Sequence, residues 1–174
     1  MSPDELLAMA YARDSGDIRE HLPKLRALAA ACSTVVEFGV YRGASSAALL
    51  AGTAGRLYSY DTMKQPEVDT LLDAADGRWI FRLCDSHKAA IPECDLLFID
   101  SWHTAEHLRG ELETHHAKVK RWIVMHDTET FAHKGEDGGP GLWGAMMDFL
   151  ERHPEWRLSE HFTNCNGLSI LERA

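Results

Sequence analysis

The chain has 174 residues, of which 45% are hydrophobic and 26% charged, a balance typical of one folded domain with a substantial core. A formal net charge of −9 argues against a nucleic-acid partner, because phosphates would be repelled. No apolar stretch approaches the roughly 20 residues of a membrane span, and acidic residues stand where a signal peptide has basic ones. We therefore expect a cytoplasmic protein without a membrane partner.

The first two thirds of the chain alternate between two kinds of segment. Residues 1–32 predict an N-terminal helical segment, with a helix over 17–32 that breaks near Pro23. Short segments rich in branched and aromatic residues then predict buried strands at 34–40, 56–61, 79–85, 95–100 and 121–127. Helix-like stretches separate or follow them at 44–52, 65–76 and 104–119. Strands that alternate with helices predict a parallel sheet with helices on both faces.

The last third predicts a loop, a helix and a hairpin. Residues 132–141 are too rich in glycine to predict one shape, and they are either a mobile lid or a plain connection. A helix over 142–153 should stop before Pro154, and two strands should meet at a turn formed by Asn166 and Gly167. The expected fold is α/β: a Rossmann-like, mostly parallel sheet of about seven strands with a C-terminal antiparallel hairpin. We expect a single domain over 1–174, with its core at 33–174.

Acidic residues mark the ends of the predicted strands. Four of the five strands finish on an acid, and the first carries Glu37 just before a glycine turn; the four are Asp61, Asp85, Asp100 and Asp127. The carboxyl ends of parallel strands meet at one edge of a sheet, where open α/β folds bind ligands. So much charge on one edge predicts a ligand or a cation there.

The turn after the first strand contains Gly39 and Gly43. Three residues separate them, so the turn does not match the GxGxxG fingerprint of dinucleotide-binding enzymes. Glycines there would let a ligand lie against the backbone, and Ser45 is placed to cap the following helix. The alternative is an ordinary strand-to-helix turn with tight packing.

The stretch "VVEFGVYRGASS", followed by "YSYD", resembles the first two motifs of class I S-adenosylmethionine-dependent methyltransferases. The resemblance implies that the loop from Gly39 through Val40 to Gly43 wraps the methionine and ribose of the cofactor, with Glu37 beneath it. It also implies that Asp61 holds the ribose hydroxyls. The remaining cofactor contacts that we expect are Asp85, Ser86, Ser45 and Asp100.

Two later stretches, "LLFIDSWHTAEHLRGEL" and "WIVMHDTETF", resemble a subgroup of that family. It includes cephalosporin-hydroxylase-like proteins and macrolide-sugar, metal-dependent O-methyltransferases. The resemblance implies that Asp100 and Asp127 ligate a divalent metal, and that His103 is the catalytic base. The metal expected by resemblance is Mg²⁺ or Mn²⁺. His126 stands where the subgroup has an acid, and if His126 is a ligand, Mn²⁺, Fe²⁺ or Zn²⁺ would suit the site better than Mg²⁺.

Each of these residues also has a structural alternative. Asp100 and Asp127 would then cap the loops that follow them, His103 would begin the next helix, and His126 would be a satisfied histidine at a strand end. The other histidines, His115 and His116 among them, are read as surface residues.

The leading hypothesis is a methyltransferase that methylates a hydroxyl group of a small molecule with the help of S-adenosylmethionine and a divalent metal. One alternative is a non-haem iron oxygenase that uses His103, His126 and Asp127 as a facial triad. Another is a methyltransferase-like domain that binds without turnover. Only residues 1–30 and the 132–141 loop remain to cover a substrate, so we expect a homodimer that helps to close the pocket.

Overall fold

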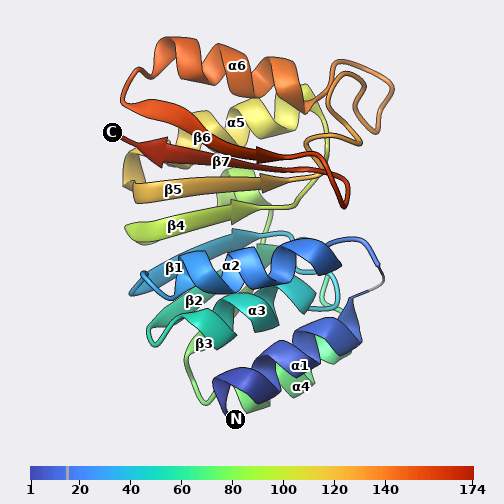
Figure 1. Cartoon of the computed structure of the whole chain (residues 1–174), viewed down its shortest axis with the longest axis vertical. Coiled ribbons are helices and arrows are strands. Elements are labelled where there is room, and N and C mark those ends of the chain that lie inside the picture. The colour runs from blue at the N-terminus through green and yellow to red at the C-terminus, as the bar shows by residue number, and fades with distance from the viewer. Residues whose placement is uncertain (15) are drawn as a thin grey trace.

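A mixed sheet forms the centre of the protein in the computed structural model, which describes residues 1–14 and 16–174. Seven strands of this described part lie in the order β3-β2-β1-β4-β5-β7-β6 (Figure 1). The first five are parallel to one another, and β7 is antiparallel to both β5 and β6. The strands are β1 Thr34–Phe38, β2 Arg56–Asp61, β3 Trp79–Leu83, β4 Cys94–Ile99, β5 Val119–His126, β6 Trp156–Phe162 and β7 Leu168–Arg173.

Helices cover both faces of the sheet, and two hydrophobic clusters fill the space between. The first cluster joins the sheet to α1–α4, and the second joins it to α5 and α6. The Rossmann-like fold with a C-terminal hairpin is therefore confirmed. The helices are α1 Pro3–Arg13, α2 Leu22–Ala29, α3 Ala44–Gly52, α4 Glu67–Ala74, α5 Ala105–His115 and α6 Leu142–Arg152, with 3₁₀ turns η1 Arg19–His21, η2 Ser86–Lys88 and η3 His116–Lys118.

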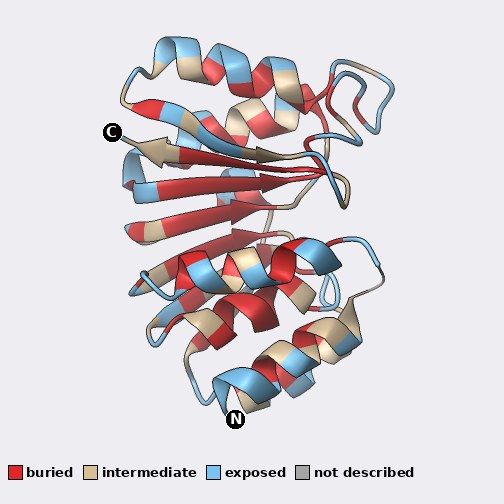
Figure 2. Ribbon diagram, viewed as in Figure 1, coloured by how far each residue is buried: buried red, intermediate tan, exposed pale blue. Residues whose placement is uncertain are grey.

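The central strands are buried on both sides, as Figure 2 shows along β1, β4 and β5. In β4, Leu96 and Phe98 belong to the cluster under α1–α4, whereas Leu97 and Ile99 belong to the cluster under α5 and α6. Side chains of a strand alternate between the faces of the sheet. A strand covered on both faces therefore needs apolar residues at every position, and this explains the unbroken apolar runs of the sequence.

The predicted elements form with boundaries that differ by a few residues, and two of the helices differ most. Pro23 lies in the first turn of α2 rather than inside a longer helix, because the first amides of a helix have no intrahelical partner and proline loses nothing there. The helix predicted over 104–119 ends at His115. Its last residues form η3, and Val119 already pairs with Cys94 of β4.

The C-terminal turn forms where the sequence predicted it. Asn166 and Gly167 have φ values of 66° and 94°, in the left-handed region that asparagine and glycine tolerate best. The resulting hairpin places β7 against β5 and β6 at the edge. Over residues 1–14 and 16–174, none of the helices combines the length and the hydropathy that crossing a membrane requires.

Candidate active site

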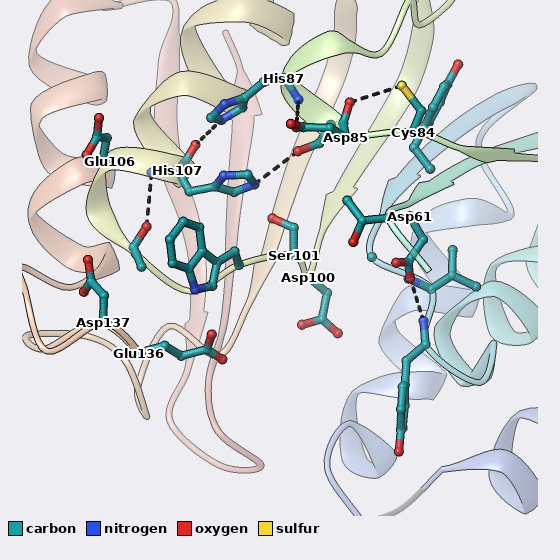
Figure 3. A pocket seen from close by; sticks show the side chains of 18 residues that line it. Asp61, Cys84, Asp85, His87, Asp100, Ser101, Glu106, His107, Glu136 and Asp137 are labelled. Carbon is teal, nitrogen blue, oxygen red and sulfur yellow. Dashed lines mark hydrogen bonds between the residues drawn. The ribbon is translucent and has the colours of Figure 1, made fainter. Parts of the chain in front are cut away.

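A cavity of about 820 Å³ opens where β1, β2, β3 and β4 end, the size of a typical small-molecule site. Figure 3 shows several of the acids that face it. Six of the predicted cofactor residues line the cavity, and three, Glu37, Gly43 and Ser45, do not. The six are Gly39, Val40, Asp61, Asp85, Ser86 and Asp100. Topology alone thus gathers residues from four separate strand ends around one space.

The turn after β1 is shaped by a close approach between two strand ends. Gly39 has a φ of 82°, and a Cβ atom there would lie 1.8 Å from the backbone oxygen of Asp100. Asp61, at the end of β2, accepts hydrogen bonds from the amides of Val40 at 2.8 Å and Tyr41 at 3.0 Å. The aspartate therefore holds the turn against the cavity wall while its carboxylate still faces the cavity.

Glu37 supports this turn from beneath and is wholly buried. The hydroxyls of Ser45, Ser46 and Ser59 each donate to its carboxylate at 2.6 Å. Glu37 therefore faces the protein interior beneath the turn and does not line the cavity, and its contact with the cofactor stays a prediction. Ser45 does not cap α3, since the N-cap is Gly43 and no side chain caps that end; instead Ser45 lines a small adjoining cavity beside Asp100.

Burial raises the pKa of Glu37 from 4.5 to about 7, and the three serine hydroxyls offset part of this rise. The folded state thus binds the proton more tightly than the unfolded chain. The stabilisation is complete below the unfolded pKa and is lost as the pH rises through the folded pKa. For a shift of this size the loss is of the order of 3 kcal/mol.

We therefore expect the free energy of unfolding to fall between about pH 5 and pH 8 in the wild type, and to fall less in Glu37→Gln, which cannot titrate. Urea denaturation of both proteins across this range measures the difference. All other titrating groups are shared, so their contributions cancel. Parallel pH profiles for the two proteins would contradict the assignment.

A polar chain that the sequence analysis missed lies on the α5 side of the cavity. His107 lines the cavity, and its Nε2 lies 3.2 Å from the Ser86 hydroxyl and 3.3 Å from Glu111 Oε1. Ser101 donates to the same glutamate oxygen at 2.7 Å. Glu111 is wholly buried, so it fixes the imidazole from behind. The available signal was the spacing of His107 and Glu111, because residues four apart share one face of a helix.

Two histidines and two aspartates converge beside the cavity. Nε2 of His103 lies 2.9 Å from Asp127 Oδ2 and 3.3 Å from Asp100 Oδ1. Nδ1 of the buried His126 lies 3.5 Å from Asp100 Oδ1 and 3.6 Å from Asp127 Oδ2. Asp127 has a φ of 60°, a strained conformation of the kind that functional sites retain. The predicted metal ligands Asp100, His126 and Asp127 and the predicted base His103 are thus brought together.

Charge couples the four groups. Burial disfavours the charged forms of His103 and His126, but the two carboxylates outweigh it and raise the pKa of each histidine to about 11. Burial likewise opposes ionisation of Asp100, and the histidines outweigh it and lower its pKa. The ionised carboxylates and the protonated histidines of the cluster thus stabilise one another.

The donors of this cluster fit a divalent cation. Among the described residues, the buried Nδ1 of His126 has no hydrogen-bond partner, and at 3.5 Å or more its contacts with the carboxylates are too long for good hydrogen bonds. Ligand atoms of Asp100, His103 and Asp127 lie within 4.8 Å of one another, as do those of Asp17, His126 and Asp127. Two carboxylates and an imidazole suit Mn²⁺, Fe²⁺ or Zn²⁺ better than Mg²⁺. Asp17 is a ligand candidate that the sequence analysis missed, because it lies far away in the chain.

The glycine-rich loop has one defined fold in the structure. Its Glu136 accepts from His103 Nδ1 at 2.7 Å, and the amide of Glu136 donates to the backbone oxygen of His103 at 3.0 Å. Lys134 and Pro140 form a backbone bridge. Glu136 and Asp137 line the cavity on the side opposite Asp61 (Figure 3). The loop thus supplies a wall of the cavity and a second partner for His103.

This arrangement defines the class of protein. A sheet of the order found here, with β7 antiparallel and a cavity over a glycine turn and acidic strand ends, is that of class I methyltransferases. Residues 36–128 match the family described as Methyltransferase domain. The chain belongs to this family and is an S-adenosylmethionine-dependent methyltransferase. A search of curated proteins by sequence gives no match.

Solved structures of methyltransferases share the fold across almost the whole chain. An O-methyltransferase from Bacillus cereus in complex with S-adenosylhomocysteine is 16% identical, with a TM-score of 0.69 over 99% of this chain and 90% of that one. The 1,6-didemethyltoxoflavin N1-methyltransferase of Burkholderia thailandensis is 13% identical, with a TM-score of 0.71 over 94% and 80%. The N-methyltransferase NodS of Bradyrhizobium japonicum is 14% identical, with a TM-score of 0.68 over 98% and 96%. Identities this low speak for the shared fold alone.

Proposed function

We propose that this methyltransferase transfers the methyl group to a hydroxyl of a small molecule and that a divalent cation assists the reaction. The observation that carries the proposal is the cluster beside the cavity. Asp100 lines the cavity and lies close to Asp127. It also faces the buried Nδ1 of His126, which has no hydrogen-bond partner in the described part of the chain. A bound divalent cation there would lower the pKa of a hydroxyl that coordinates it.

The strand ends on the other side of the cavity suit the cofactor. Asp61 faces the cavity from β2, and Asp85 and Ser86 face it from the turn after β3. A carboxylate accepts two hydrogen bonds from vicinal hydroxyls, so Asp61 is the proposed partner of the ribose. The acids also favour the positively charged sulfonium of S-adenosylmethionine.

His103 is the proposed base. It is held by Phe131, whose ring stacks on its own at 4.8 Å and 3°, and by Glu136 at Nδ1. Because both ring nitrogens lie beside carboxylates, the pKa of His103 is raised and the imidazole stays protonated. Neutralisation of Asp100 and Asp127 would remove the cause of the raised pKa, and Nε2 would then be free to take a proton from the substrate.

The charge of the cavity restricts the substrate. Among the described residues that line it there are six carboxylates and neither Lys nor Arg: Asp61, Asp85, Asp100, Glu106, Glu136 and Asp137. Glu106, Glu136 and Asp137 lie on the side away from Asp61 (Figure 3), so a substrate there meets acids even when the cofactor is bound. We therefore propose a neutral or cationic hydroxylated substrate rather than a phosphate or carboxylate.

Two other activities are compatible with parts of the site. A non-haem iron oxygenase would use His103, His126 and Asp127, but the cavity beside the glycine turn and the family membership both favour methyl transfer. A domain that binds without turnover remains as the second alternative. Anaerobic titration with Fe²⁺ and 2-oxoglutarate, beside a methyl-transfer assay on neutral and cationic alcohols, distinguishes the three.

Calorimetry tests the proposal directly. We expect S-adenosylhomocysteine to bind the wild type, and Mn²⁺ to bind separately with one site that Asp127→Asn removes. Asp61→Ala should weaken cofactor binding about 10- to 100-fold, since a carboxylate that accepts two hydroxyls is lost, and should leave the Mn²⁺ site intact. Absence of cofactor uptake by the wild type, with or without Mn²⁺, would refute the proposal.

A further inference from the structure

A second group of histidines and acids lies at the far edge of the sheet from the cavity. Glu113 belongs to the last turn of α5, His116 begins η3, and His153 is the C-cap residue of α6. Glu155 follows just before β6. Since η3 leads into the start of β5, this group, here called the α5–α6 cluster, lies at the amino ends of the strands (Figure 1).

The side chains of the α5–α6 cluster face one another. Nε2 of His153 lies 3.3 Å from both carboxylate oxygens of Glu113. The rings of His116 and His153 are 4.1 Å apart at 52°. Ligand atoms of Glu113, His116 and His153 all lie within 4.8 Å of one another. Glu155 Oε1 is 3.7 Å from His153 Nδ1 and 3.9 Å from His116 Nδ1.

One possible metal ligand of the α5–α6 cluster, Nδ1 of His116, is buried. In the part of the chain that the structure describes, Nδ1 of His116 has no hydrogen-bond partner, and a buried polar atom left unpaired is costly. An imidazole nitrogen that is buried and makes no hydrogen bond is available as a metal ligand.

An ordinary surface ion pair accounts for only part of the cluster. Arg152 bonds Glu113 Oε1 at 2.6 Å, which leaves the other carboxylate oxygen beside His153. The ion pair does not explain why Nδ1 of His116 has no hydrogen-bond partner within residues 1–14 and 16–174. It also gives no reason for two half-buried histidine rings to lie 4.1 Å apart. The side chains of His116 and His153 are 16% and 18% exposed.

We propose that Glu113, His116 and His153 form a second metal site, distinct from the active site, that binds Zn²⁺. Two imidazoles and one carboxylate are a common donor set for zinc, and Glu155 or water completes a tetrahedron. The ion ties the end of α5 and η3 to the end of α6, which are joined in the chain only through β5 and the 127–141 loop. The ion therefore holds the ends of α5 and α6 together at the amino ends of the strands.

The test is zinc binding to the full chain. The wild type should bind one more Zn²⁺ than the double variant His116→Gln/His153→Gln, whose affinity at this site should fall at least about 100-fold. His161→Gln, in which a histidine outside both clusters is changed, serves as the matched control and should keep the full zinc content. Asp100→Asn/Asp127→Asn should lose only the active-site metal, so the two sites are counted separately.

Two further measurements keep the proposal falsifiable if the double variant folds poorly. Co²⁺ should give the intense visible absorption of a tetrahedral site in the wild type, and Glu113→Gln alone should weaken it. Arg152→Gln should tighten zinc binding about two- to fivefold, because Arg152 competes with the zinc ion for the carboxylate of Glu113. Zinc should raise the Tm of Asp100→Asn/Asp127→Asn, which keeps only the α5–α6 site, by about 5 °C at a hundredfold excess over its Kd. Equal zinc content in the wild type and the histidine variant, or weaker binding by Arg152→Gln, overturns the proposal.

Discussion

His103→Gln should lower kcat about 10²- to 10⁴-fold, the range that general-base catalysis contributes. Nε2 of His103 lies between Asp100 and Asp127, and the glutamine amide cannot take up a proton there. The loss should fall on kcat rather than on the affinity for S-adenosylhomocysteine, because Asp61, the proposed ribose partner, lies on the side of the cavity opposite Glu136, the loop residue that contacts His103. Steady-state kinetics with the preferred alcohol, together with calorimetry, separate the two quantities.

The matched control for this experiment is His133→Gln. His133 lies in the same loop region as Glu136 but is exposed, and its variant should retain wild-type kcat. If His103→Gln keeps full activity, His103 is not the base. If neither the wild type nor either variant turns over any alcohol while all bind the cofactor, the domain that binds without catalysis becomes the better account.

Gly39→Ala should destabilise the fold by at least about 4 kcal/mol or prevent it from forming, since two penalties act at one residue. The φ of 82° is costly for any residue with a Cβ, and that Cβ would lie 1.8 Å from the backbone oxygen of Asp100. Relief of the clash must separate the ends of β1 and β4, which form the floor of the cavity. Cofactor binding should therefore be lost along with stability.

Gly77→Ala isolates the first penalty from the second. Gly77 also has a positive φ, of 73°, but nothing lies within 4 Å of the position of its Cβ. This variant should lose only about 1–2 kcal/mol, the cost of the left-handed conformation. Urea denaturation of both variants measures the difference, and equal losses would show that the contact with Asp100 yields easily.

The acidic residues at the strand ends show how much of the site could be predicted from the pattern of the sequence. Asp61 ends β2, and Asp85 and Asp100 follow the ends of β3 and β4. Parallel strands place their carboxyl ends at one edge of the sheet whatever the rest of the chain does. Their arrival at one cavity therefore follows from the alternation of strands and helices. Glu37 fits the same pattern but lies one residue before the end of β1, so its side chain points to one face of the sheet rather than into the cavity. On that face it meets three serines inside the protein.

Two histidines, His115 and His116, show what the local sequence pattern does not predict. His115 was expected at the surface and is buried, where its Nε2 meets the backbone oxygen of Ser86 at 2.8 Å. His116 is half-buried against His153. His115 packs against Phe38 of β1, whereas His116 packs against Phe149 and His153 at the end of α6. Burial of this kind depends on contacts with residues that are distant in the chain, and no local periodicity reports it.

The amino-acid sequence by itself determined the order of strands and helices, the hairpin at Asn166 and Gly167, and the family. These properties depend on neighbouring residues: hydrophobic period, turn chemistry and a short motif. Only the tertiary structure decided that Glu136 joins His103, that Asp17 approaches His126 and Asp127, and that Glu113 meets His153. Such contacts join residues distant in the chain, and their distances depend on the packing of whole helices and loops against the sheet.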